Sequence, residues 1–171
     1  MAEYSTATYN MNEERQNRLI WLDLEMTGLD FDNDRIIEIA IIITDRRLDI
    51  IAESQSLVIK QPDELLDAMD SWNTKQHTKS GLVNRVQQST ITEEMAENKM
   101  LDFISQHVDK NASPMCGNSI CTDRRFLYKY MPRLENYFHY RHIDISTIKE
   151  LGRRWYGDEA VQGFKKRNCH L

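Results

Sequence analysis

Apolar residues in the first third of the chain form short runs rich in β-branched side chains. Residues 19–25 predict a short strand, and residues 35–44 (RIIEIAIIIT) form a run too apolar for a sheet edge, which predicts a central strand. A tight connection at residues 45–47 leads into residues 48–60. The three segments therefore predict an antiparallel meander.

The pattern changes to helical spacing after residue 90. Thr90 and Glu93 have the spacing of a capping box, and apolar residues then recur with helical period over 96–108. Two strand-and-helix pairs follow, at 114–117 with 122–130 and at 141–145 with 146–155, the last helix being capped by Ser146. A meander followed by alternating helices and strands predicts an α/β fold with a mixed five-stranded sheet flanked by helices.

The length and hydrophobicity of the chain fit one domain. It has 171 residues, of which 40% are apolar, and this is enough to bury a core. We expect residues 1–17 to be a mobile N-terminal tail and residues 18–171 to form the domain. The sequence has no run of the ~18 apolar residues that a membrane span needs, and it begins with no secretory signal. We expect a cytoplasmic protein without a membrane partner; a mitochondrial location is the alternative.

The net charge of −5 is unevenly distributed. Residues 1–110 carry 11 Lys and Arg against 21 Asp and Glu, a net charge of −10, whereas residues 111–171 carry 11 against 6, a net charge of +5. Sequence-independent binding of long nucleic acid depends on many basic contacts. The charge therefore argues against long duplex nucleic acid as a partner, and a nucleic-acid substrate would be held through few phosphates.

Two carboxylates lie two residues apart on the first predicted strand. Because strand side chains alternate, Asp23 and Glu25 point to one face, and Leu22 and Leu24 point to the other. Two acids about 6–7 Å apart are costly to desolvate unless a cation lies between them, and Mg²⁺ takes oxygen ligands. Taken alone, such a pair is equally compatible with a surface or salt-bridged pair.

A third acid, Asp123, falls on the first turn of the helix that follows the strand at 114–117. If this strand lies beside the strand at 19–25, Asp123 faces the first two acids. Three converging carboxylates suit a paired-metal site, in which ions ~3.5–4 Å apart bind the attacking and leaving oxygens of a phosphodiester. The alternative for Asp123 alone is an acid favoured by the helix dipole.

His170 is the candidate general base. It lies beside Cys169 and is followed only by Leu171. An imidazole titrates near neutral pH and can take a proton from a metal-bound water. A lone histidine near a terminus is more often simply exposed.

Four segments carry a resemblance to a known family. They are WLDLEMTGL at 21–29, WNTKQHTKSGL at 72–82, GNSICTDRRFL at 117–127 and YFHYR at 137–141. From about residue 18 to the last residue, the chain resembles the oligoribonucleases, which are DEDDh exonucleases of the ribonuclease-H-like superfamily. The D-x-E-x-T-G-L and I-I-E-I-A patterns are common to the superfamily. The second and fourth segments point to the oligoribonucleases themselves.

The resemblance implies a ribonuclease-H-like fold and a 3′→5′ exoribonuclease. The family hydrolyses very short RNA oligonucleotides, dinucleotides especially, to nucleoside 5′-monophosphates. By this resemblance Asp23, Glu25 and Asp123 match the metal-binding acids for two Mg²⁺ or Mn²⁺ ions. His170 matches the catalytic histidine.

The resemblance also implies a substrate site. Leu29 and Trp72 match the pair that wedges and stacks the two bases, and stacking tolerates any base sequence. Groups that close over the 5′-phosphate of the substrate match Ser119, His77, Tyr140, Arg141 and Ser146. In the family the tyrosine and arginine come from the partner subunit of a homodimer. From the residues alone, Trp72 is also compatible with a core aromatic.

The chain departs from the family pattern at its end. The fourth acid of the family follows the histidine as H-x-x-x-x-D, and this sequence stops one residue after His170. We therefore expect the chain to lack the last metal ligand and the C-terminal closing helix that carries it. This departure raises the alternative of a non-catalytic nucleotide-binding or dimerisation module. The motifs common to the superfamily leave a DNA exonuclease as another alternative.

Overall fold

The computed structural model describes residues 11–162, which contain a mixed sheet of six strands. The strands are β1 Leu19–Met26, β2 Ile36–Thr44, β3 Ile50–Glu53, β4 Leu57–Val58, β5 Met115–Gly117 and β6 His142–Asp144. They run in the order β3-β2-β1-β5-β6, and β4 also pairs with β2. The pairs of β2 are antiparallel, whereas β1 with β5 and β5 with β6 are parallel. The mixed sheet is confirmed, and β1 lies beside β5 as the site prediction requires.

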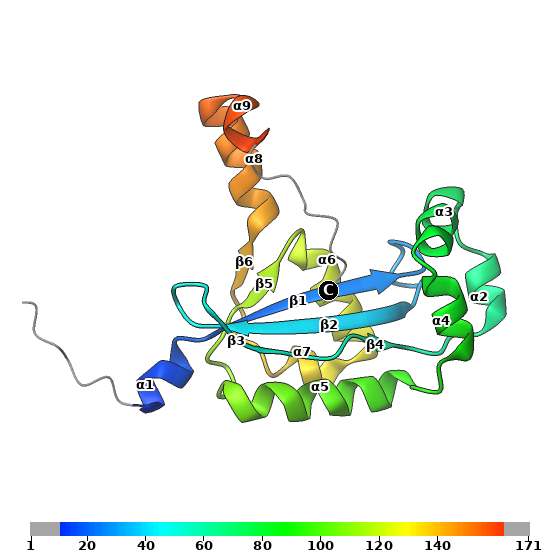
Figure 1. Cartoon of the computed structure of the whole chain (residues 1–171), viewed down its shortest axis with the longest axis horizontal. Coiled ribbons are helices and arrows are strands. Elements are labelled where there is room, and N and C mark those ends of the chain that lie inside the picture. Colours follow the sequence, from blue (N-terminus) through cyan, green and yellow to red (C-terminus); the bar gives the residue numbers. More distant parts are fainter. Residues whose placement is uncertain (1–10, 163–171) are drawn as a thin grey trace, which may run out of the picture.

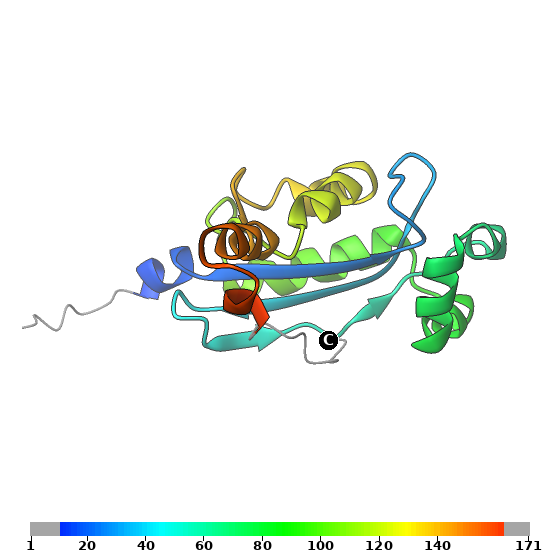
Figure 2. The ribbon, with the colours of Figure 1, turned by 90° about the horizontal axis from the view of Figure 1, so that it is seen from above.

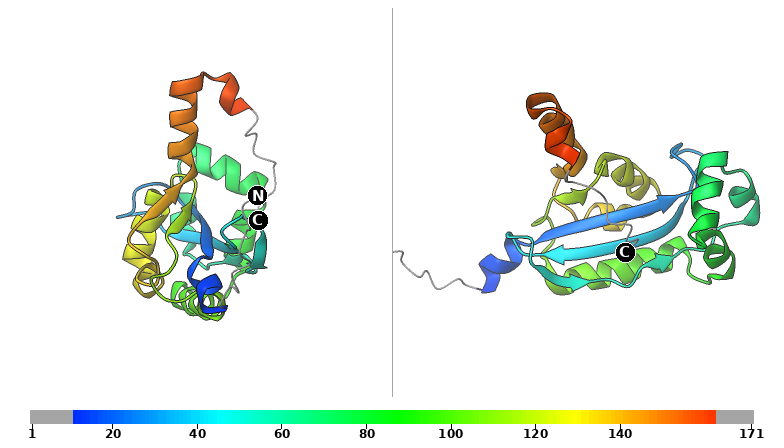
Figure 3. Two further views of the ribbon diagram at one scale, coloured as in Figure 1. Left: turned by 90° about the vertical axis from the view of Figure 1, so that its left-hand side faces the viewer. Right: turned by 45° about the horizontal axis from the view of Figure 1, so that its top comes forward.

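The helices of the described part surround this sheet unequally. They are α1 Met11–Gln16, α2 Asp63–Asp67, α3 Ser71–Lys79, α4 Leu82–Gln88, α5 Glu93–His107, α6 Ile120–Tyr130, α7 Pro132–Glu135, α8 Ile145–Tyr156 and α9 Glu159–Gln162. Helices α5, α6 and α7 lie on one side of the sheet (Figure 2), and α2 to α4 group beyond the tip of β1 (Figure 1). Helix α8 extends away from the sheet (Figure 3). None of these helices has the length and apolar character that crossing a bilayer requires.

The main core lies between the sheet and helices α5 to α7. Leu22 and Leu24 of β1 are buried in one apolar cluster with Met100 of α5 and Phe126 of α6. Asp23, between the two leucines, is exposed. The alternation predicted for β1 is therefore present, and it places the acids of β1 on the face opposite this core.

A smaller apolar cluster attaches α2 and α4 to the sheet. Ile37 of β2 packs there with residues that include Leu66 of α2 and Leu82 and Val86 of α4. The apolar pattern of the sequence did not predict α2, α3 or α4. They have five, nine and seven residues, and such short helices offer too few turns for a clear apolar period.

The strand expected at residues 48–60 is divided into β3 and β4. The N–H of Ser54 donates to the carbonyl of Ile41 at 2.8 Å, and the N–H of Ile41 donates to the Ser54 hydroxyl at 2.9 Å. A side-chain oxygen thus replaces a carbonyl in the ladder, and the pairing is interrupted. Pairing resumes where Val58 lies opposite Glu38. The sheet therefore has six strands where the pattern predicted five.

Helix α5 begins two residues later than the capping-box pattern predicted. The side chain of Thr92, not Thr90, accepts a hydrogen bond from the N–H of Met95 at 3.2 Å. The carbonyl of Ile91 accepts from the N–H of Lys60 at 2.8 Å. This contact ties the residues before Thr92 to the segment after β4, so that the helix begins only after them.

Part of the expected N-terminal tail is helical and attached to the domain. Nε of Arg15 in α1 pairs with Asp109 at 3.1 Å. The other guanidinium nitrogens donate to the carbonyls of Gln106 and Ser105 at 2.7 and 3.0 Å. Carbonyls at the end of a helix lack partners within it, so this arginine satisfies groups at the end of α5. Residues 1–10 lie outside the described part.

Candidate active site

Asp123 reaches β1 from the first turn of α6. Its Oδ1 atom accepts a hydrogen bond from the N–H of Leu24 at 3.0 Å, and the residue is only 7% exposed. The parallel ladder with β5 extends along β1 only to Trp21, which lies opposite Cys116. Further along β1, the carboxylate of Asp123 supplies the acceptor for the N–H of Leu24.

The turn between β5 and α6 allows this close approach. A Cβ atom added to Gly117 would lie 2.8 Å from the carbonyl oxygen of Leu22, so a side chain at this position would push the turn away from β1. Ser119 has a positive φ of 51°, which is uncommon for a residue other than glycine. The G-N-S sequence therefore forms a sharp turn that directs α6 onto β1.

The charges of Asp23 and Glu25 act on Asp123. Burial raises the pKa of Asp123 to about 7, the hydrogen bond from Leu24 opposes this rise, and repulsion from Asp23 and Glu25 adds to it. Asp23 and Glu25 are thus close enough to disfavour the ionised form of Asp123. A divalent cation would remove this repulsion, because hard cations take carboxylate oxygens as ligands.

The donor set fits a divalent cation in its chemistry, but the side chains do not form a complete cage. Within residues 11–162, no group of three or more His, Cys, Asp or Glu side chains is arranged to hold a metal ion. Oε2 of Glu25 lies 4.0 Å from Nδ1 of His77. Binding an ion between Asp23, Glu25 and Asp123 would therefore require side chains to rearrange.

His77 connects α3 to the end of β1. It is 4% exposed, and its Nε2 atom lies 3.0 Å from the carbonyl oxygen of Met26. Because a carbonyl can only accept, Nε2 carries a proton. The ring therefore faces the strand that bears Glu25. The contact of His77 with a substrate phosphate stays a prediction.

The two residues predicted to hold bases are exposed at one end of the sheet. Leu29 follows β1 and is 74% exposed, and Trp72 lies in the first turn of α3 and is 65% exposed. Both segments lie at the end toward which β1 runs (Figure 1). Trp72 is therefore not a core aromatic, and this alternative is wrong.

The T-G-L sequence fixes the start of the loop that carries Leu29. The carboxylate of Asp34 accepts from the Thr27 hydroxyl and from the N–H of Asp30, both at 2.8 Å. A Cβ at Gly28 would overlap the Asp34 carboxylate. Glycine at this position lets the loop fold over Asp34, and the next residue, Leu29, then points outward into solvent.

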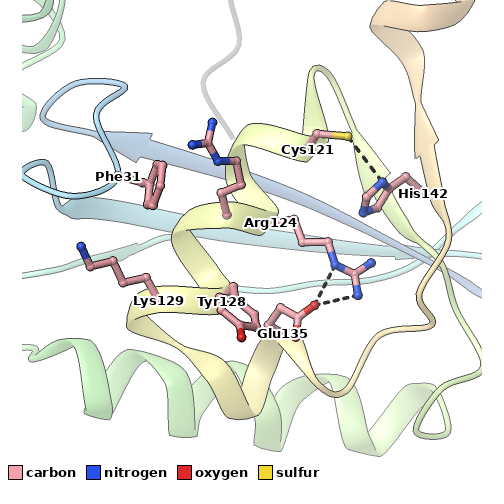
Figure 4. A pocket seen from close by; sticks show the side chains of 8 residues that line it. Phe31, Cys121, Arg124, Tyr128, Lys129, Glu135 and His142 are labelled. Atoms are coloured by element: carbon pink, nitrogen blue, oxygen red, sulfur yellow. Dashed lines mark hydrogen bonds and ion pairs between the residues drawn. The ribbon is translucent and has the colours of Figure 1, made fainter.

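Helix α6 also holds the far side of this loop. The guanidinium group of Arg125 lies 4.0 Å from the ring centroid of Phe31, within the range of a cation–π contact. Nζ of Lys129 pairs with Asp32 at 2.9 Å. Figure 4 shows Phe31 facing α6. The helix that presents Asp123 therefore also positions the loop that presents Leu29.

The residues predicted to close over a 5′-phosphate fall into separate groups. The hydroxyls of Ser119 and Ser146 lie 3.1 Å apart, so the structure brings these two together. Tyr140 and Arg141 are exposed and lie before β6, whereas Ser146 follows β6. Within a single chain, Tyr140 and Arg141 therefore lie at one end of β6, and Ser146 lies at the other. His170, the predicted base, lies outside the described residues.

Comparisons with known proteins agree with this geometry. A family model described as Exonuclease, of the RNase T type, matches residues 20–170. The oligoribonuclease of Halorhodospira halophila is 60% identical over 153 residues, covering 90% of this chain and 83% of the relative. The oligoribonuclease of Alcanivorax borkumensis is 56% identical over 158 residues, covering 92% of this chain and 87% of the relative. The chain belongs to the oligoribonuclease family.

Solved structures of lower sequence identity show the same fold. An apo exonuclease I is 16% identical with a TM-score of 0.63, over 84% of this chain and 32% of that one. The metal-free complex of Escherichia coli exonuclease I with single-stranded DNA is 15% identical with a TM-score of 0.62, over 83% of this chain and 31% of that one. The chain spans about a third of these larger proteins. This likeness confirms the exonuclease fold expected for an oligoribonuclease.

A hollow of about 590 Å³ lies on the outer face of α6 (Figure 4). Arg124 at its wall pairs with Glu135 at 2.7 Å and donates to the carbonyls of His139 and Tyr140 at 3.0 and 3.2 Å. This arginine therefore fixes the loop that presents Tyr140 and Arg141, two residues that the oligoribonuclease resemblance assigns to the substrate site.

Asp144 caps a helix, a role that the sequence pattern assigned to another residue. We expected Ser146 to cap α8, but the side chain of Asp144 accepts from the N–H of Ser146 at 2.8 Å and is the cap. An aspartate at the end of a strand and immediately before a helix is a recognised capping signal, and it could have been found on that ground.

Proposed function

We propose that this oligoribonuclease-family chain hydrolyses very short RNA, dinucleotides especially, from the 3′ end to nucleoside 5′-monophosphates. The observation that carries the proposal is the buried carboxylate of Asp123, which is bonded to Leu24 of β1 and lies within charge contact of Asp23 and Glu25. This arrangement occurs in a chain that is 54–60% identical to proteins named oligoribonuclease.

Asp23, Glu25 and Asp123 are the residues that would hold Mg²⁺ or Mn²⁺, with two ions per active site expected in the complete protein. Bound ions of this kind activate a water molecule and stabilise a leaving oxygen. The chain contributes the orientation of the carboxylates, because β1 and α6 are both packed into the main core. His170 stays the predicted acceptor of the water proton.

Two features would give the chain a preference for very short RNA. Two exposed side chains would hold two bases, and the phosphate site would close the binding groove at the 5′ side of the dinucleotide. Leu29 and Trp72 offer exposed apolar surface for two bases, and stacking contributes ~1–3 kcal/mol per base. Ser119 and Ser146 would close on a phosphate at the 5′ side of the same dinucleotide. The net charge of −10 over residues 1–110 gives a longer strand little electrostatic attraction.

We also propose that the active form is a homodimer. Tyr140 and Arg141 precede β6 and Ser146 follows it, so one chain does not gather all three residues at one phosphate. Arg124 holds the loop of Tyr140 and Arg141 on the outer face of α6. A second copy that receives this loop would complete the phosphate site.

The test is to incubate the full chain with Mn²⁺ and a 5′-phosphorylated diribonucleotide. Release of mononucleotides supports the proposal, and binding without release supports the non-catalytic module. Faster cleavage of the matching deoxyribonucleotide would support the DNA exonuclease. Asp123→Ala is the control for activity from a contaminating nuclease, because it removes the buried acid and should abolish release.

A further inference from the structure

One carboxylate oxygen of Asp144 accepts hydrogen bonds at the beginnings of both α6 and α8. Oδ1 of Asp144, at the end of β6, accepts hydrogen bonds from the N–H of Ser119 at 2.9 Å and from the N–H of Ser146 at 2.8 Å. Ser119 precedes α6, and Ser146 is the second residue of α8. The hydroxyl of Ser119 donates a hydrogen bond to the hydroxyl of Ser146 at 3.1 Å.

This contact compensates for an unfavourable backbone conformation. Ser119 has a left-handed φ of 51°, and such a residue persists only where its surroundings hold it. The first N–H groups of a helix have no partner inside the helix, so Asp144 satisfies groups that would otherwise need water. Without Asp144, the turn at Ser119 and the start of α8 could separate.

We propose that Asp144 is a positioning residue for the 5′-terminal phosphate of the substrate. It sets the spacing of the Ser119 and Ser146 hydroxyls and does not itself contact the substrate. The inference rests on the proposed function, in which these two hydroxyls bind that phosphate.

Two consequences follow from the geometry. The backbone N–H groups of Ser119 and Ser146 are held on Asp144, whereas the serine hydroxyls can rotate toward a ligand, so the phosphate is recognised by the hydroxyls and not by these amides. The negative charge of Asp144 also lies beside the phosphate site and opposes anion binding. Asp144 therefore acts through the position of its oxygen and not through its charge.

Two substitutions distinguish the effect of the position of the Asp144 oxygen from the effect of its negative charge. Asp144→Asn keeps an oxygen at the same place and removes the charge, whereas Asp144→Glu keeps the charge and moves the oxygen. The measurement is kcat/KM of the full chain for a 5′-phosphorylated diribonucleotide and for the same dinucleotide with a 5′-hydroxyl. The ratio of the two values reports the contribution of the phosphate contacts.

We expect Asp144→Glu and Asp144→Ala to lower this ratio roughly five- to tenfold, mainly through KM, because the displaced hydroxyls keep only part of their hydrogen bonding to the phosphate. Asp144→Asn should keep the ratio within about twofold of wild type or raise it, because it preserves the hydrogen-bond geometry. Thr92→Ala is the matched control. It removes the cap of α5, on another part of the sheet, and should lower stability without changing the ratio.

An unchanged ratio in Asp144→Glu would overturn the inference, as would an Asp144→Asn variant impaired as much as Asp144→Glu. Either result decides the matter even if Asp144→Ala does not fold. A wild-type chain that releases no mononucleotide contradicts the proposed function itself. A wild-type chain that cleaves but ignores the 5′-phosphate contradicts the phosphate site, and with it this role of Asp144.

Discussion

The Nε2 atom of His77 donates a hydrogen bond to the carbonyl oxygen of Met26, at a distance of 3.0 Å. Met26 is the last residue of β1, directly after Glu25, and His77 lies on the helix that begins with Ser71 and Trp72. This buried contact therefore fixes the distance between the aromatic side chain expected to stack a base and a carboxylate expected to bind metal.

Replacing His77 should affect stability as well as binding. His77→Ala removes the hydrogen bond to the carbonyl of Met26, and we expect it to reduce the free energy of unfolding by roughly 1–3 kcal/mol. It should also raise KM for dinucleotides, because α3 loses its attachment to β1. Trp72→Ala is the comparison: it should raise KM without lowering stability, since the side chain is exposed. Chemical denaturation and initial rates measure both effects, and wild-type stability in His77→Ala would contradict this role.

Each of the three acids should be required for hydrolysis. We expect Asp23→Ala, Glu25→Ala and Asp123→Ala to abolish mononucleotide release, because each removes a carboxylate from the predicted metal site. Circular dichroism should show an intact fold in all three variants. Near-normal turnover of Asp123→Ala at saturating Mg²⁺ would show that the metal assignment is wrong.

The stability of the metal-free chain should depend on pH through Asp123. Its pKa is raised from the ordinary 3.8 to about 7, so the folded chain holds this proton more tightly than the unfolded chain does. The stability that it contributes is complete below about pH 4 and is lost as pH rises through 7. Asp123→Asn cannot ionise, and its side-chain oxygen can still accept from Leu24.

We therefore expect Asp123→Asn to be more stable than wild type at pH 8 in the presence of a chelator, by of order 1–4 kcal/mol. The difference should shrink as the pH falls from 7 toward 4. Urea denaturation across this range measures it. Asp102→Asn, which changes an exposed carboxylate of α5, is the matched control and should show no such trend. If the wild type were more stable than Asp123→Asn at pH 8, burial and charge repulsion would not destabilise the ionised Asp123 as we infer.

Activity should fall as the substrate lengthens. A phosphate site at the 5′ side of a dinucleotide closes the groove, so a longer strand must bend away and lose contacts. Initial rates on 5′-phosphorylated two-mers, five-mers and twenty-mers measure this. We expect Arg141→Ala to remove most of the preference, because charge-assisted phosphate contacts contribute ~1.5–3 kcal/mol. Equal wild-type rates at all three lengths would favour a general exonuclease.

The elements with strong local patterns were predicted from the sequence, and the weakly patterned ones were not. The β-branched run at 35–44 and the apolar period over 96–108 correspond to β2 and α5. Both signals come from neighbours along the chain. Helices α2 to α4 have short and mostly polar sequences, and the packing of α2 and α4 on Ile37 of β2 is a tertiary contact that no local pattern shows. The division of β3 from β4 likewise depends on a contact between Ser54 and the neighbouring strand.

For the site, the sequence alone determined that Asp23 and Glu25 share one face of a strand, because strand side chains alternate. Its motifs also indicated the family, and the comparisons confirmed it. Only the tertiary structure showed that Asp123 lies against Leu24, since this requires β5 to pair with β1 across almost a hundred residues. The bridge from Asp144 to Ser119 and Ser146 could not be predicted for the same reason. Such contacts depend on how strands and helices pack, and sequence spacing carries no information about those distances.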